Sequence, residues 1–88
     1  MTPELRAQLR LSILRQADAA LSRGLSLEVY VSGARIIGIP CTATDVEREI
    51  DYLIDKKMIE KLRPPISPEL WRAAIRAEGR DWLAQEGY

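Results

Sequence analysis

The sequence contains no histidine and only one cysteine, and its formal net charge at neutral pH is zero. The absence of histidine argues against a zinc site and against a nucleophile paired with histidine. A lone cysteine cannot form an internal disulfide, which fits a reducing cytoplasm. We therefore expect a cytoplasmic protein that is not an enzyme and that needs no metal or other cofactor.

Long apolar runs are also missing. None approaches the length that spans a bilayer, and the N-terminus lacks a signal-peptide pattern, so we expect no membrane partner. The zero net charge counts against strong non-specific binding to nucleic acid, since DNA-binding domains are usually basic. The 88 residues are 47% hydrophobic and 30% charged, which is typical of one small soluble domain.

A helix is predicted to begin at Thr2-Pro3-Glu4, which offers an N-cap threonine, a proline at the first helical position and an acid in the first turn. It should run to about Arg23 and stop at Gly24. Its apolar residues form two stripes. The first contains Leu5, Leu9, Ile13, Ala17 and Ala20, and the second, well round the helix, contains Ala7, Leu11, Leu14 and Leu21.

A helix that is apolar on two sides must be covered twice, and so short a chain has few elements that could do so. The second stripe therefore predicts an interface with a second copy of the chain, in a homodimer. The alternative is a helix that lies deeper within a single chain.

A second helix is predicted over roughly Leu27–Ile37, capped by Ser26 and ended by Gly38. Several β-branched and aromatic residues in this segment would also suit a strand. The position of Gly33 interrupts any alternation, however, and the segment has the length of a helix. Pro40 then disfavours helical backbone at the residue before it and predicts a turn.

The segment Thr44–Glu60 is central to the prediction. Thr44 and Glu47 have the spacing of a capping box, in which a hydroxyl and a carboxylate each bind a backbone N–H. The helix that follows, to about Lys57, has an apolar side and a polar side. The apolar side contains Val46, Ile50, Leu53 and Ile54, and the polar side contains Asp45, Arg48, Tyr52 and Asp55. Two helices joined by a short turn predict a helix-turn-helix.

After this helix, residues 59–63 alternate apolar and polar, which predicts a strand. The proline-rich residues 64–68 predict a bend, and residues 71–76 alternate again, as a returning strand would. In the alternative, Ser67-Pro68-Glu69 is also a possible helix start and could open a helix through Leu83. A short helix from Glu78 to Gln85 is expected to close the chain.

Three further residues have plain structural interpretations. Cys41, next to the turn proline, is expected to fill space between the second and third helices. Trp71 and Trp82 are expected to pack in the core, since aromatic side chains supply much of the buried area of a small domain. Neighbouring acids such as Asp45, Glu49 and Asp51 indicate a solvated helix face rather than a catalytic pair or a metal site.

The order helix, helix, turn, helix, two-stranded hairpin, short helix resembles a winged helix-turn-helix domain. Residues 49–60 resemble the passage from recognition helix into wing in that superfamily, and residues 75–83 resemble its C-terminal ending. Lys57 stands where a glycine is common, and Arg76 stands where a capping threonine is common. The opening segment and the length are similar to small ArsR-like proteins of Mu-like transposable phages. The implied fold class is α+β, mainly α: three helices, a two-stranded β wing and a short C-terminal helix.

The resemblance implies a homodimeric transcriptional regulator that binds double-stranded DNA. The recognition helix would offer its exposed side chains to the major groove, and the wing would meet phosphates. Arg48 is the expected guanine reader, because its fork matches the O6 and N7 acceptors. The candidate DNA-binding residues are Thr44, Asp45, Arg48, Glu49 and Tyr52 on the helix, Lys61, Arg63, Arg72 and Arg76 on the wing, and Arg35 at the end of the second helix.

The charge of the recognition segment opposes this function. Residues 44–60 contain six acids and three bases, and carboxylates that face phosphates reduce affinity. By contrast, residues 61–76 contain four bases and one acid. The alternative is a protein-interaction or assembly module that uses the same scaffold without DNA. A mixed-charge exposed helix and a tryptophan in the hairpin suit this function, because tryptophan and arginine commonly anchor protein interfaces.

Overall fold

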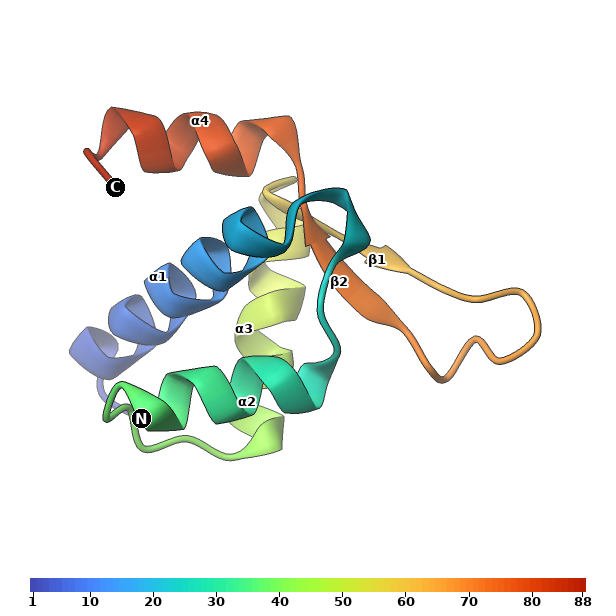
Figure 1. The fold of residues 1–88 in the computed structure, drawn as a ribbon. Coiled ribbons are helices and arrows are strands. Elements are labelled where there is room, and N and C mark those ends of the chain that lie inside the picture. The colour runs from blue at the N-terminus through green and yellow to red at the C-terminus, as the bar shows by residue number, and fades with distance from the viewer.

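The computed structural model describes residues 1–88. Its elements, in order, are α1 (Pro3–Ala20), a 3₁₀ turn (Leu21–Arg23), α2 (Leu27–Ile36), α3 (Ala43–Asp55), β1 (Ile59–Leu62), β2 (Arg72–Ile75) and α4 (Ala77–Gln85). The first three helices pack together, the β1–β2 hairpin extends away from them, and α4 lies along α1 (Figure 1). The prediction of a mainly helical α+β fold with a two-stranded antiparallel sheet is confirmed.

The start of α1 agrees with the prediction, because the Thr2 hydroxyl accepts a hydrogen bond from the Leu5 N–H at 3.1 Å. The predicted end also agrees, since the last turn tightens into the 3₁₀ segment before Gly24, whose φ is +70°. A side chain at Gly24 would place its Cβ 2.7 Å from the Ala73 carbonyl oxygen. Glycine is therefore required both by the left-handed backbone and by the close approach of β2.

The N-cap of the helix α3 lies two residues earlier than predicted. The capping box consists of Thr42 and Asp45: the Thr42 hydroxyl accepts from the Asp45 N–H at 3.1 Å, and Asp45 Oδ2 accepts from the Thr42 N–H at 2.9 Å. The prediction of Thr44 and Glu47 is wrong by two residues. Both pairs have the required spacing, but Cys41 is buried directly before the helix, which leaves little chain for a longer turn.

The two strands confirm the predicted hairpin. β1 pairs antiparallel with β2, with Ile59 opposite Ile75 and Leu62 opposite Arg72. The alternative of one long helix from Pro68 is therefore wrong. Leu25, between α1 and α2, forms an additional antiparallel bridge to Ala73, with reciprocal backbone hydrogen bonds of 2.9 Å. This bridge ties the base of the hairpin to the helices.

Lys57 and Arg76, the two positions at which the sequence differs from the resemblance stated above, have distinctive backbone geometry. Lys57, where a glycine is common, has φ of +61°, in the left-handed region that glycine adopts most easily. Arg76, where a threonine is common, is the N-cap residue of α4 and makes no side-chain capping bond. The backbone thus keeps the conformation that each preferred residue would favour.

One cluster of buried residues forms the core and draws on every helix and both strands. Tyr30 is fully buried in it and donates its hydroxyl to the Ala73 carbonyl at 2.7 Å, and burial raises the pKa of this phenol. Cys41 is buried, as predicted, and burial raises the pKa of its thiol although Arg35 opposes the shift. Trp71 and Trp82 are half-buried and pack against the cluster.

The second apolar stripe of α1 is largely covered by the chain itself. Leu14 is only 2% exposed, so it is not available to a partner chain, and Leu11 packs partly against the core. Ala7 and Leu21 are exposed, but they lie at opposite ends of the helix. The prediction of a four-residue dimer interface is therefore wrong for Leu14, because α4 packs against α1 and supplies the second cover.

Candidate nucleic-acid interface

The outward face of α3 contains part of the predicted set. Thr44 and Arg48 are exposed, and Tyr52 is 37% exposed. Asp45 is occupied by the capping box, and the hydrogen bond from the Thr42 backbone lowers the pKa of its carboxyl. Of the predicted major-groove residues, Arg48 is the exposed cation on this face.

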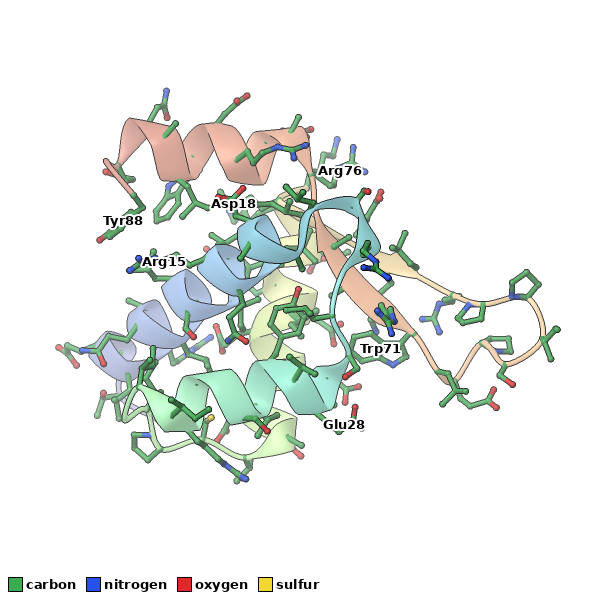
Figure 2. All side chains as sticks on the ribbon, viewed as in Figure 1. Arg15, Asp18, Glu28, Trp71, Arg76 and Tyr88 are labelled. Carbon is green, nitrogen blue, oxygen red and sulfur yellow. The ribbon has the colours of Figure 1, made fainter.

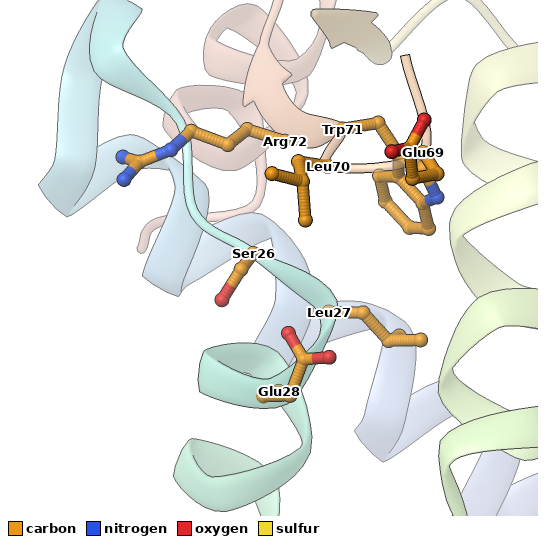
Figure 3. A pocket seen from close by; sticks show the side chains of 7 residues that line it. All are labelled: Ser26, Leu27, Glu28, Glu69, Leu70, Trp71 and Arg72. Atoms are coloured by element: carbon orange, nitrogen blue, oxygen red, sulfur yellow. The ribbon is translucent and has the colours of Figure 1, made fainter. Parts of the chain in front are cut away.

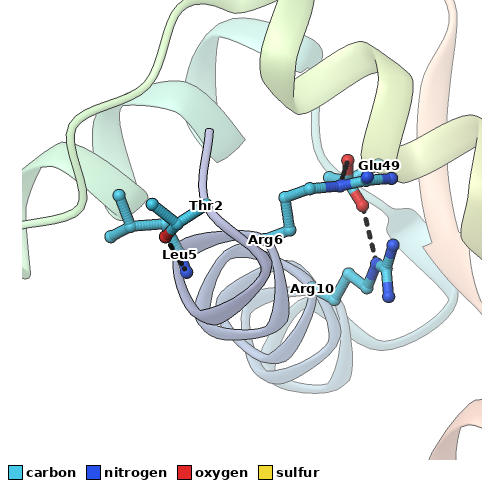
Figure 4. Close-up of polar contacts among 5 residues, drawn as sticks. All are labelled: Thr2, Leu5, Arg6, Arg10 and Glu49. Carbon is cyan, nitrogen blue, oxygen red and sulfur yellow. Dashed lines mark hydrogen bonds and ion pairs between the residues drawn. The ribbon is translucent and has the colours of Figure 1, made fainter.

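Glu49 does not belong to that face. It is 2% exposed and turned toward α1, where Oε2 accepts from Arg6 Nε at 3.2 Å and Oε1 accepts from Arg10 Nε at 2.6 Å (Figure 4). Its place in the candidate DNA-binding set is therefore wrong. Glu49 lies three residues after Val46 and four before Leu53, which puts it on the buried side of the helix. That spacing, together with two arginines one turn apart on α1, could have identified the pairing.

Tyr52 completes this contact between α1 and α3. The Arg10 guanidinium lies over the Tyr52 ring, with Cζ 3.8 Å from the ring centroid. The Lys56 ammonium lies 5.6 Å from the same centroid. Arg6 and Arg10 are absent from the residues predicted to form the site, because they belong to a different helix from residues 44–60.

Most of the predicted phosphate-binding bases are held in contacts within the chain. Lys61 Nζ lies 3.5 Å from Asp51 Oδ1 and 4.4 Å from the Trp71 ring centroid. The Arg76 guanidinium is 3.6 Å from the carboxylate of Glu60 and 3.6 Å from that of Glu78.

Two other predicted bases also contact the backbone. Arg72 Nη1 donates to the Gly24 carbonyl at 3.5 Å, and Arg35 Nε donates to the Cys41 carbonyl at 3.0 Å. Arg63 is exposed at the start of the loop between the strands, beyond the end of β1. Arg63 is therefore the hairpin base best placed to contact a ligand outside the chain.

The ion pairs change the charge balance of the recognition segment. Its excess of three negative charges arises from six acids and three bases in residues 44–60. Four cations from outside the segment, Arg6, Arg10, Lys61 and Arg76, pair with three of those acids, Glu49, Asp51 and Glu60. Because Arg76 is shared with Glu78, which lies outside the segment, these cations offset the excess of three negative charges without exceeding it. The exposed residues Arg48, Lys56 and Lys57 therefore belong to a segment whose net negative charge is largely offset by cations from other elements.

Two further hollows lie on the surface, one beside the hairpin and one between α1 and α3. One, of about 330 Å³, separates the start of α2 from the loop before β2, between Ser26, Leu27 and Glu28 on one side and residues 69–72 on the other (Figure 3). The other is a mainly apolar groove of about 380 Å³ along α1, lined in part by Ala7, Leu11, Leu14, Met58 and Trp82.

No group of three or more cysteine, aspartate and glutamate side chains is arranged to hold a metal ion. None of the helices combines the length and the apolar composition that crossing a membrane requires. Comparisons with protein-family models, with curated proteins and with solved structures found no match to this chain.

Proposed function

We propose that this chain is a winged helix-turn-helix protein that binds double-stranded DNA and acts as a transcriptional regulator of phage type. In this proposal, α3 is the recognition helix in the major groove, and the loop of the β1–β2 hairpin contacts phosphates. The order of elements, the antiparallel hairpin and the bridge from Leu25 to Ala73 all support the winged-helix assignment.

The observation that carries the proposal is the pairing of carboxylates within residues 44–60 with cations from other elements. The sequence alone places an acidic segment where DNA would lie. In the fold, Glu49 is buried between two arginines, and Asp51 and Glu60 each have a cationic partner. The main electrostatic objection to DNA binding is thereby reduced, since fewer unpaired carboxylates would face the phosphates.

The decisive test is fluorescence anisotropy of a labelled duplex of random sequence, titrated with protein at low and at near-physiological salt. We expect binding at micromolar protein or tighter at low salt, with affinity that falls steeply as salt rises. Arg48→Ala and Arg63→Ala should each weaken binding to the duplex. The effect of Arg48→Ala should be greatest on a duplex that contains the specific recognition sequence. A wild-type protein that fails to bind the duplex at low salt would contradict the proposal.

A second candidate function, protein interaction, is favoured by the groove along α1. Its floor is apolar, and Arg10 and Lys56 contribute to its lining at the Tyr52 end. This combination suits an amphipathic helix with acidic flanking residues. Under this hypothesis the helix α3 is scaffold, and DNA is not the ligand.

The substitution Leu11→Glu separates the two functions, because Leu11 lines the groove and is only partly buried, whereas Leu14 is fully buried. Loss of a protein partner with DNA binding retained would support a separate docking role. Sedimentation of the wild-type protein tests whether that partner is a second copy of the chain. A monomer at all accessible concentrations would exclude the homodimer.

A further inference from the structure

The buried Glu49 is paired with two cations that α3 does not itself supply. Arg6 and Arg10 lie one turn apart on α1, and each uses its Nε to bind one carboxylate oxygen (Figure 4). The two Nη groups of each guanidinium are left free to donate elsewhere. The Arg6 and Arg10 side chains are 45% and 27% exposed, and no buried nitrogen of the half-buried Arg10 lacks a partner. Their unused donors therefore face solvent.

These donors lie beside the recognition helix. Arg6 and Arg48 line the same hollow of about 130 Å³, together with Met1, Asp45 and Glu49. The two carboxylates there already accept from protein donors: Asp45 Oδ2 from the Thr42 N–H, and both oxygens of Glu49 from the arginines. The hollow is thus suited to an anion, since its guanidinium groups have donors to spare and its carboxylates are engaged.

Arg10 is held in a defined orientation. Its Nε bond to Glu49 is 2.6 Å, and its guanidinium is stacked on the Tyr52 ring at 3.8 Å. A guanidinium that is fixed in this way loses little conformational freedom when it binds a phosphate, and its planar fork matches two phosphate oxygens. Most bases of the hairpin, by contrast, are paired with exposed carboxylates or with backbone carbonyls.

We propose that Arg6 and Arg10, together with Arg48, bind the phosphate backbone of duplex DNA alongside α3. Glu49 is the positioning residue that orients both α1 guanidiniums. This inference rests on the proposed function and deepens it, because it adds a backbone contact from α1, on the side of α3 away from the hairpin pair of Asp51 and Lys61. Phosphate contacts of this kind fix the register of a recognition helix without reading sequence.

The test compares three alanine variants that each remove one positive charge from α1. Arg6→Ala and Arg10→Ala remove the proposed contacts. Arg15→Ala is the matched control, since Arg15 lies about half a turn round the helix from Arg6 and packs its guanidinium 5.7 Å from the Tyr88 ring centroid (Figure 2). Binding of a labelled random-sequence duplex is measured by anisotropy over a series of salt concentrations.

Each of the first two substitutions should weaken binding roughly three- to tenfold at low salt and should lower the slope of log affinity against log salt by about 1. Arg15→Ala should leave that slope unchanged. Equal behaviour of all three variants would overturn the inference. If Arg48→Ala still weakened binding in that case, the proposed function would stand without the α1 contact. If the wild-type protein did not bind the duplex at all, both the proposed function and the α1 contact would be contradicted.

Glu49→Gln distinguishes positioning from simple neutralisation. This substitution makes the protein more positive by one charge, so charge alone predicts tighter binding to DNA. If Glu49 orients Arg6 and Arg10, the substitution should instead weaken binding severalfold, because both guanidiniums lose their anchor. Tighter binding would show that Glu49 only neutralises them and would overturn its positioning role.

The folded state of every variant is checked by circular dichroism, because the substitutions touch a buried ion pair.

The wild-type protein provides a second measurement that needs no substitution. The Nε–H resonances of Arg6 and Arg10 should shift in NMR spectra when the duplex is added, whereas that of Arg15 should not. Unshifted Arg6 and Arg10 resonances in a saturated complex would contradict the inference.

Discussion

Glu49 and Asp51 are both acids of α3, two residues apart, but their surroundings differ sharply. The Glu49 side chain is 3% exposed and binds two arginines of α1, whereas the Asp51 side chain is 58% exposed and lies 3.5 Å from Lys61 of the hairpin. A charged side chain that is shielded from water needs an ion-pair or hydrogen-bond partner, and removing that partner strongly reduces the free energy of unfolding. In water, the same pairing contributes little. The two sides of α3 thus contain ion pairs of similar appearance and very different energetic weight.

The largest expected effect comes from removing both partners of Glu49. The double substitution Arg6→Ala with Arg10→Ala leaves a carboxylate buried without compensation, which should reduce the free energy of unfolding by about 3 kcal/mol or more. Chemical denaturation monitored by circular dichroism measures this change. A reduction below about 1 kcal/mol would mean that Glu49 reaches water easily. The ion pairs of Glu49 and of Asp51 would then not differ in their contribution to stability.

The capping box of α3 should give an intermediate effect. Thr42→Ala removes the hydroxyl that accepts from the Asp45 N–H and should cost about 1 kcal/mol of stability. Thr44→Ala is the matched control, since Thr44 is exposed and makes no capping bond, and it should change stability very little. The reverse result would place the start of the helix at the sequence-predicted residue.

The pH dependence of the free energy of unfolding should reveal the contribution of the Asp45 carboxylate to the capping box. The Thr42 backbone hydrogen bond lowers the pKa of Asp45 below its ordinary value of 3.8. The stabilising contribution is therefore fully present above that value and is lost as the pH falls through the lower folded-state pKa. Urea denaturation of the wild-type protein and of Asp45→Asn, compared as the pH falls below about 4, should show a smaller loss in the variant. Parallel curves would contradict this assignment.

The smallest effect is expected on the hairpin side. Asp51→Ala and Lys61→Ala should each change the free energy of unfolding by less than about 0.5 kcal/mol through the ion pair, because Asp51 remains well solvated. A double-mutant cycle isolates the pair from the packing of Lys61 on Trp71. A coupling energy as large as that of Glu49 with its arginines would show that solvent exposure does not determine the strength of the ion pairs on the two sides of α3.

The positions of the helices and of the hairpin were accessible from sequence, whereas details that depend on neighbours were not. Thr2-Pro3-Glu4 correctly marked the start of α1, and the alternation of residues 59–63 marked a strand. The α3 cap was displaced because two threonines each precede an acid by three residues, and local chemistry alone does not choose between them. The burial of Leu14 in the second stripe of α1 likewise depends on the elements that pack against α1, and periodicity does not reveal them.

The sequence by itself determined the local structure: where helices begin, which segments alternate, and which faces are apolar. These properties follow from backbone preferences and from periods of 3.6 and 2 residues, both of which act between near neighbours. Only the tertiary structure decided which carboxylates of α3 are neutralised. The decisive pair, Arg10 and Glu49, is separated by 39 residues, and it forms because the packing of α1 against α3 brings their side chains together.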